Sequence, residues 1–239
     1  MKIGILAAAI VSGLIVSALI VAKPWVTIHH TKPIVVKGYA ELPIEADTGS
    51  LTASVAARGA SNAEAYEKAG TLLSRVKEIL SQNLKDDSEI EELSPSMQTV
   101  MKLDHNGRRT NEIDFYKSSR RLRVTTKNVA ELQETNKSLF DLNEEGILVS
   151  VSGPEFFVSD LESIKLELVS AATLNGKKRA EEIARNSGEY LGSLVSAKQG
   201  VIQITKENST KTSSYGVYDT ETIKKVIKLV VTLEYEIEG

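Results

Sequence analysis

The hydrophobic pattern of the chain begins with an apolar stretch without charged residues, Ile3–Ala22, between Lys2 and Lys23. Twenty helical residues at about 1.5 Å each cover the roughly 30 Å hydrocarbon core of a bilayer. The stretch exceeds the usual apolar core of a signal peptide, about 7–15 residues, although a cleaved signal remains the alternative. We therefore predict a retained transmembrane anchor over residues 1–23 and a tether over residues 24–33.

The charges around this stretch give the expected orientation. Lys2 and the amino terminus favour a cytoplasmic N-terminus, whereas Lys23 and Lys32 argue weakly for the reverse. We expect a single-pass membrane protein whose C-terminal domain lies outside the cytoplasm. If the segment is cleaved as a signal, the same domain is secreted or periplasmic.

Two strand patterns and a helix follow the tether. Residues Ile34–Leu42 are β-rich, and apolar residues then alternate with polar ones over 51–58. Ser61 and Glu64 have the spacing of a capping box, which predicts a helix that ends near residue 83.

The same order recurs in the next segment. Residues Ile90–Leu103 and Ile113–Thr126 are predicted to form a hairpin, because Asn106-Gly107 between them is a strong turn signal. Asn128 is the predicted N-cap of a second helix. A further strand is expected over Ile147–Val151.

A long helical pattern runs from a predicted N-cap at Asp160 to Ser187. Its centre carries small residues one turn apart, Ala172, Gly176 and Ala180, and such a stripe allows another backbone to approach closely. The stripe is a candidate assembly surface between subunits. The alternative is that it packs against the sheet of its own chain.

The chain ends in two more strand patterns, Val195–Thr205 and Ile223–Ile237, joined by the polar segment Glu207–Thr220, which we expect to be mobile. Hairpins that alternate with helices predict an α+β fold with antiparallel or mixed sheets covered by helices, in the order ββα-ββα-βα-ββ. We assign residues 34–239 to this domain. Two sub-domains, about 34–145 and 146–239, are an alternative division.

Composition narrows the classes of function. The 239 residues carry a net charge of −3, a pI near 5.8 and 41% hydrophobic residues, typical of a globular protein without a nucleic-acid-binding surface. The absence of Cys excludes disulfides and thiolate chemistry, and three His offer few ways to build an acid–base or metal centre. We therefore predict no enzyme activity, no catalytic residues, no cofactor and no metal.

Charged residues gather in the predicted hairpin. Glu91 and Glu92 belong to an acidic run at the start of its first strand, and Arg120 and Arg121 lie in its second strand. Opposite charges that face each other across a strand pair stabilise it by about 0.2–1 kcal/mol each. The alternative hypothesis is that the four residues form a charged surface site, as in an envelope hydrolase or a small-ligand-binding protein.

Two stretches resemble the SIMPL-domain family, formerly the domain of unknown function 541, which includes bacterial periplasmic immunogenic proteins. The first is Gly38-Tyr39-Ala40-Glu41-Leu42 with Ala46-Asp47, similar to the family's G-x-G-E-[hydrophobic]…P-D opening. The second is Gly153-Pro154-Glu155-Phe156-Phe157-Val158-Ser159-Asp160, continued by Ala171-Ala172, by Lys177-Lys178-Arg179-Ala180-Glu181-Glu182-Ile183-Ala184, by Gly188 and by Leu191-Gly192. Ala40 and Ala46 replace a usual Gly and Pro, so the chain is a divergent member.

The resemblance implies an α+β domain of bacterial envelope proteins, exported or membrane-anchored, without an established enzyme activity and with ring-forming oligomers among its relatives. It supplies no functional residue set. The leading hypothesis is a non-enzymatic module that forms a homo-oligomer or binds an envelope protein partner in a stress-related role.

Overall fold

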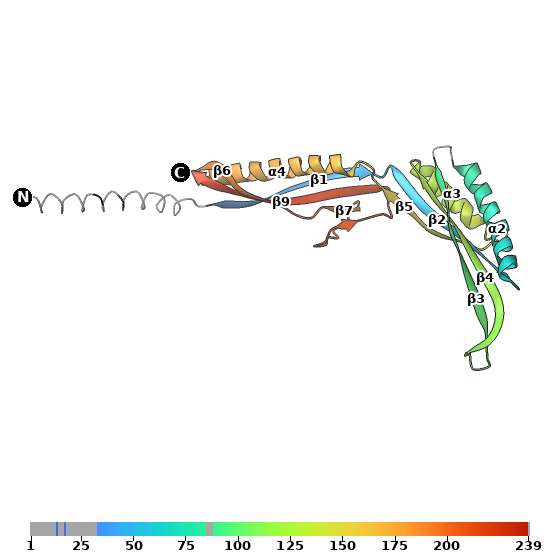
Figure 1. Cartoon of the computed structure of the whole chain (residues 1–239). Coiled ribbons are helices and arrows are strands. Elements are labelled where there is room, and N and C mark those ends of the chain that lie inside the picture. The colour runs from blue at the N-terminus through green and yellow to red at the C-terminus, as the bar shows by residue number, and fades with distance from the viewer. Residues whose placement is uncertain (1–12, 14–16, 18–32, 85–87, 239) are drawn as a thin grey trace, which may run out of the picture.

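The computed structural model describes residues 13, 17, 33–84 and 88–238, which contain two β-sheets that lie end to end, each covered by helices on one face (Figure 1). The predicted anchor and tether lie outside the described residues, apart from positions 13, 17 and 33. Within the described ranges, no helix combines the length and the apolar composition that crossing a bilayer requires.

The first sheet is built around the C-terminal strand. Its strands are β1 (Ile34–Glu45), β6 (Tyr190–Gln199), β7 (Gln203–Lys206), β8 (Val217–Tyr218) and β9 (Lys224–Glu238), and it is covered by α4 (Leu161–Asn186). β9 pairs with β1 along one edge and with β6 and β7 along the other, all antiparallel, while β7 and β8 are parallel. The sheet is therefore mixed.

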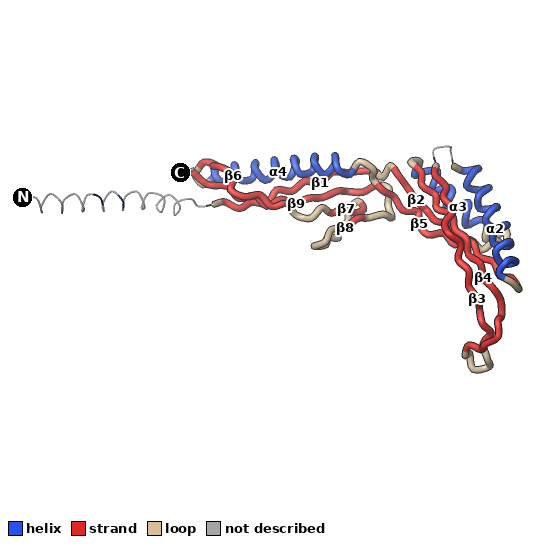
Figure 2. The backbone as a smooth tube through the Cα atoms, viewed as in Figure 1, coloured by secondary structure: helices blue, strands red, loops and turns tan. Residues whose placement is uncertain are grey.

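The second sheet has the order β3-β4-β2-β5, and all of its pairs are antiparallel. Its strands are β2 (Thr48–Gly59), β3 (Glu89–Leu103), β4 (Arg109–Thr126) and β5 (Val149–Phe157), and it is covered by α2 (Asn62–Asn83) and α3 (Val129–Asp141). Figure 2 shows both helices on the same face. The predicted α+β class with helix-covered sheets is thus confirmed.

The two sheets interleave along the chain instead of following one another on either side of residue 145. β1 belongs to the sheet built around β9, and β5 belongs to the sheet built around β2. The chain therefore crosses between the sheets twice, after β1 and after β5. Asp47 ties these two crossings together, because its carboxylate accepts the Ser159 backbone N–H at 2.9 Å and the Ser159 hydroxyl at 2.6 Å.

The predicted N-caps are present at all three helices. The side chains of Ser61, Asn128 and Asp160 accept hydrogen bonds from the backbone N–H three residues further on. Each bond satisfies a donor that the first turn of a helix leaves unpaired. Gly188, just beyond α4, has the positive φ of 79° that favours glycine at this position.

Each sheet has its own core, on the face that the helices cover. In the second sheet the alternating side chains of β2, among them Leu51 and Val55, are buried against α2 residues that include Leu73 and Val76. In the first sheet alternate residues of β9, such as Ile227 and Leu233, pack with α4. No helix of the described residues lies over the opposite face of either sheet.

The polar segment from Glu207 to Thr220 is held down, contrary to the mobility expected from its composition. The Gln203 side chain donates to the carbonyl of Ser213 at 2.8 Å and accepts its N–H at 3.2 Å. Lys228 donates to the Ser209 carbonyl at 2.9 Å. These side chains belong to β7 and β9, which fasten the segment to the sheet.

Candidate functional site

The stripe of small residues on α4 packs against β1 of the same chain. Ala172, Gly176 and Ala180 are buried. A Cβ added to Gly38 of β1 would lie 2.1 Å from the carbonyl oxygen of Ala172, so helix and strand approach at backbone distance. The stripe is therefore filled from within the chain, which corrects the hypothesis that it is a surface for another subunit.

The same helix covers the free edge of β1. The side chain of Asn175 accepts the backbone N–H of Tyr39 at 3.0 Å, and Arg179 donates to the carbonyl of Lys37 at 3.2 Å. The backbone N–H and C=O groups that point to this edge belong to every second residue. Pro43, four residues beyond Tyr39, has no N–H that could pair there. β1 is therefore protected from pairing with another strand.

The charged residues of the predicted hairpin separate onto the two faces of the second sheet. Arg120 lies on the helix-covered face, where its guanidinium binds Glu92 and stands 4.8 Å above the ring of Tyr66. Lys77 of α2 binds the other oxygen of Glu92 at 2.8 Å. Hydrogen bonds from Lys77 and Arg120 lower the pKa of Glu92. This cluster joins α2 to β3 and β4.

Arg121 points to the opposite, open face, as adjacent residues of a strand must. It is exposed, and it has no hydrogen-bond or ion-pair partner among residues 33–84 and 88–238. Glu91 is on the same open face, where it pairs with Arg123 at 3.5 Å. The structure thus brings together Arg120 with Glu92 but does not gather the four predicted residues into one site.

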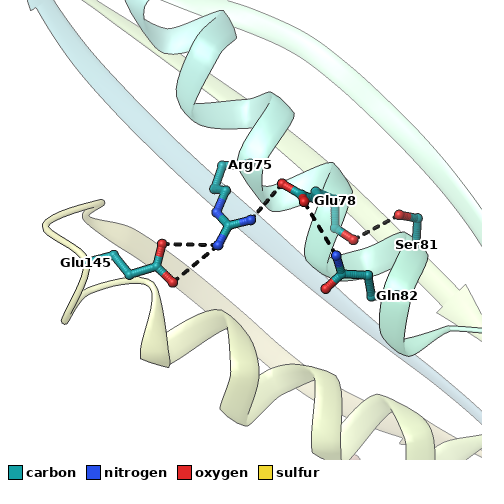
Figure 3. Close-up of polar contacts among 5 residues, drawn as sticks. All are labelled: Arg75, Glu78, Ser81, Gln82 and Glu145. Carbon is teal, nitrogen blue, oxygen red and sulfur yellow. Dashed lines mark hydrogen bonds and ion pairs between the residues drawn. The ribbon is translucent and has the colours of Figure 1, made fainter.

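The other flank of α2 is bound to the turn that follows α3 (Figure 3). One nitrogen of Arg75 donates to Glu78 at 2.6 Å, and the other lies 3.3 Å and 3.4 Å from the two oxygens of Glu145. Hydrogen bonds to Glu78 and then to Glu145 raise the pKa of Arg75. These contacts hold the two helices together and line none of the hollows described below.

Shallow hollows flank the segment fastened under the first sheet. One, of about 490 Å³, is lined by residues that include Glu41, Asn208 and Lys228, and another, of about 290 Å³, by residues that include Thr205 and Asp219. Both are open to solvent. In the described part of the chain, no three His, Asp or Glu side chains come close enough to hold a metal ion.

A buried lysine that the sequence did not single out lies at the joint between the sheets. Lys225 is fully buried, and its amino group donates to the backbone carbonyls of Asp219, at 2.6 Å, and Thr222. Burial lowers the pKa of Lys225. The lysine fixes the turn that leads into β9, and it contacts no open surface.

The outer part of the β3–β4 hairpin projects beyond the rest of the sheet, where it forms an arm of two strands over residues 100–115 (Figure 1). β2 pairs with β4 only as far as Tyr116, which lies opposite Thr99, so no third strand of the described residues supports the arm. Leu103 and Ile113 expose 63% and 43% of their surface in the arm, and Met97, just before it, exposes 42%. A two-stranded ribbon alone is only marginally stable in water.

The outer edge of β3 is open to pairing, whereas the free edge of β1 is covered by side chains of α4. The edge of β5 is interrupted by Gly153-Pro154, and Pro95 interrupts β3 itself near the body of the sheet. Beyond Pro95, the run Met97–Met101 contains no charge and no proline. The hairpin was predicted from the sequence, but its unsupported length was not, because the pattern does not show where β2 stops.

The chain belongs to the SIMPL family, described as a protein of unknown function (DUF541), whose family model matches residues 34–233. None of the curated proteins matches the chain. Among solved structures, a putative amidohydrolase/peptidase from Burkholderia cenocepacia matches with 12% identity and a TM-score of 0.29. The match covers 48% of this chain and 30% of that one, so the chain spans less than a third of that protein.

Proposed function

We propose that the protein is a non-enzymatic assembly module of the bacterial envelope, held at the membrane by residues 1–23 with its domain outside the cytoplasm. Copies associate through the arm and the adjoining edge of β3, together residues 97–115, with a stress-related or envelope-binding role for the assembled form. The observation that carries the proposal is the uncharged, unpaired edge Met97–Met101, flanked by the exposed side chains of Leu103 and Ile113. Such an edge is a template for pairing with another chain.

Two contrasts support assembly over the alternative of a charged ligand or hydrolase site. The first is that Arg120 and Glu92 already satisfy each other, together with Lys77. The second is that the free edge of β1 is covered by Asn175 and Arg179, whereas the arm has no comparable cover. An open edge of β3, in a chain that covers the free edge of β1, supports pairing with a partner strand.

The test is the native mass of the full-length protein in detergent, together with that of the double variant Leu103→Ser, Ile113→Thr. We expect the wild type to be an oligomer and the double variant to be a monomer. Leu166→Ser is the matched control, because Leu166 is 73% exposed on α4, away from the arm, and its loss leaves the oligomer intact. A monomeric wild type, or equal masses for wild type and arm variant, overturns the proposal.

A further inference from the structure

The open face of the second sheet carries a row of basic side chains that the proposed assembly role does not use. Burial shows which residues form this face: Leu51, Ala53 and Val55 of β2 are buried under α2, so residues 50, 52, 54, 56 and 58 face the other way. The strand register places partners from β4 beside them: Arg123 by Thr52, Arg121 by Ser54, Ser119 by Ala56 and Lys117 by Arg58.

Three cations of this row have no carboxylate partner in the described part of the chain. They are Arg58, Lys117 and Arg121. The guanidinium of Arg58 lies 4.4 Å above the ring of Phe115, a contact that leaves its charge unneutralised. Lys117 and Arg121 are four residues apart on one strand, or about 13 Å. We call Arg58, Lys117 and Arg121 the cationic row.

Acidic residues on the same face lie toward the joint between the sheets. Glu91 is paired with Arg123 at 3.5 Å. Glu89 and Glu155 belong to the row of Ser50 and Thr125, at the far end of β4 from the cationic row. The basic end of the face therefore keeps a local positive charge in a chain whose net charge is −3.

The surface beside the cationic row is rich in hydroxyl groups. Ser54 and Ser119 lie next to the cations, and the register continues the hydroxyl row across to Ser150 and Ser152 of β5. Each hydroxyl both donates and accepts hydrogen bonds, and no long side chain of these residues stands in the way of an extended ligand.

We infer that the open face of the second sheet binds an extended anionic polysaccharide. The cationic row, Arg58, Lys117 and Arg121, binds the charged groups of the polysaccharide, and the serine hydroxyls form hydrogen bonds with its sugar hydroxyls. Single-stranded nucleic acid fits less well, because it needs exposed aromatic rings for base stacking, and Phe115 is already covered by Arg58. An inserted lipid surface fits less well, because among the described residues this part of the face exposes no large apolar side chain to bury.

The experiment uses the full-length protein in detergent, with dextran sulfate as the probe and uncharged dextran of the same length beside it. The test variant is Lys117→Gln, Arg121→Gln. The control variant is Lys137→Gln, Lys178→Gln, which removes the same charge from exposed positions on α3 and α4. Circular dichroism and native mass are recorded for each variant, so that a loss of folding or assembly is separated from a loss of binding.

We expect the wild type and the control to bind dextran sulfate but not dextran, and the test variant to bind about three- to tenfold more weakly at low salt. No binding of dextran sulfate overturns the inference, as does equal weakening in both variants. Binding of anionic lipid vesicles or polyuridylate with no binding of dextran sulfate also overturns it. A protein that is monomeric but still binds dextran sulfate through Lys117 and Arg121 contradicts the assembly proposal and leaves this inference intact.

Discussion

Gly38 of β1 and Gly176 of α4 bring helix and strand together at backbone distance: a Cβ on Gly176 would lie 3.1 Å from the Cα of Gly38. The contact lets Asn175 and Arg179 reach the edge of β1. The small residues of α4 therefore pack against the chain's own first sheet and protect the free edge of β1. In the proposed assembly, copies associate through another part of the molecule.

Gly38→Ala should destabilise the protein strongly. The new methyl group meets the Ala172 carbonyl, a backbone atom that cannot move aside, and overpacking of this kind costs about 1–3 kcal/mol. The matched control is Gly70→Ala, where the methyl group meets only the flexible end of Arg120. Since Ala is favoured over Gly within a helix by about 1 kcal/mol, the control should be neutral or stabilising. Denaturant unfolding measures both, and equal stability of the two variants would show that the close approach is absent.

Glu92→Gln should lower stability at neutral pH by about 0.5–1 kcal/mol, because Lys77 and Arg120 lose an ionised partner. The pKa of Glu92 is lowered below 4.5 in the folded state, so its contribution is complete above the unfolded pKa and lost as the pH falls through the folded pKa. Thermal unfolding of wild type and variant should therefore converge in acid. Glu134→Gln, at an exposed i,i+3 pair with Lys137, is the control and should change little at any pH. A Glu92 effect that persists below the folded pKa would argue against an ionic origin.

Tyr39 should ionise well above the usual pKa of a tyrosine. Its hydroxyl donates to Glu41, and this bond, together with burial and the nearby negative charge, raises the pKa of Tyr39 to about 12. The difference between the ultraviolet titrations of wild type and Tyr39→Phe isolates this group. In Glu41→Gln the pKa should fall toward 10.0. A Tyr39 that titrates near 10.0 in the wild type would mean that the hydrogen bond to Glu41 is not formed.

Local features were predictable from the sequence because their causes are local. The caps at Ser61, Asn128 and Asp160 follow from side chains that satisfy the nearest unpaired N–H groups. The Asn106-Gly107 turn likewise identified the β3–β4 hairpin.

Relations between distant segments were not predictable in the same way. Nothing in the pattern of β1 shows that Ile34 pairs with Tyr235, or that the small stripe of α4 meets Gly38. The strand pattern alone also does not show on which face of the sheet a charged side chain lies, because this depends on the pairing register. Adjacent arginines therefore looked equivalent, although Arg120 is held by Glu92 and Arg121 is left on the open face.

Association through the arm is the central claim, and the absence of cysteine from the chain makes it directly testable. A single thiol is introduced into the full-length protein on the open edge of β3, as Gln98→Cys, or on the exposed surface of α3, as Gln133→Cys. Under mild oxidation and at equal concentration, the account predicts a covalent dimer for Gln98→Cys and a monomer for Gln133→Cys. The same small yield of dimer from both variants would contradict it.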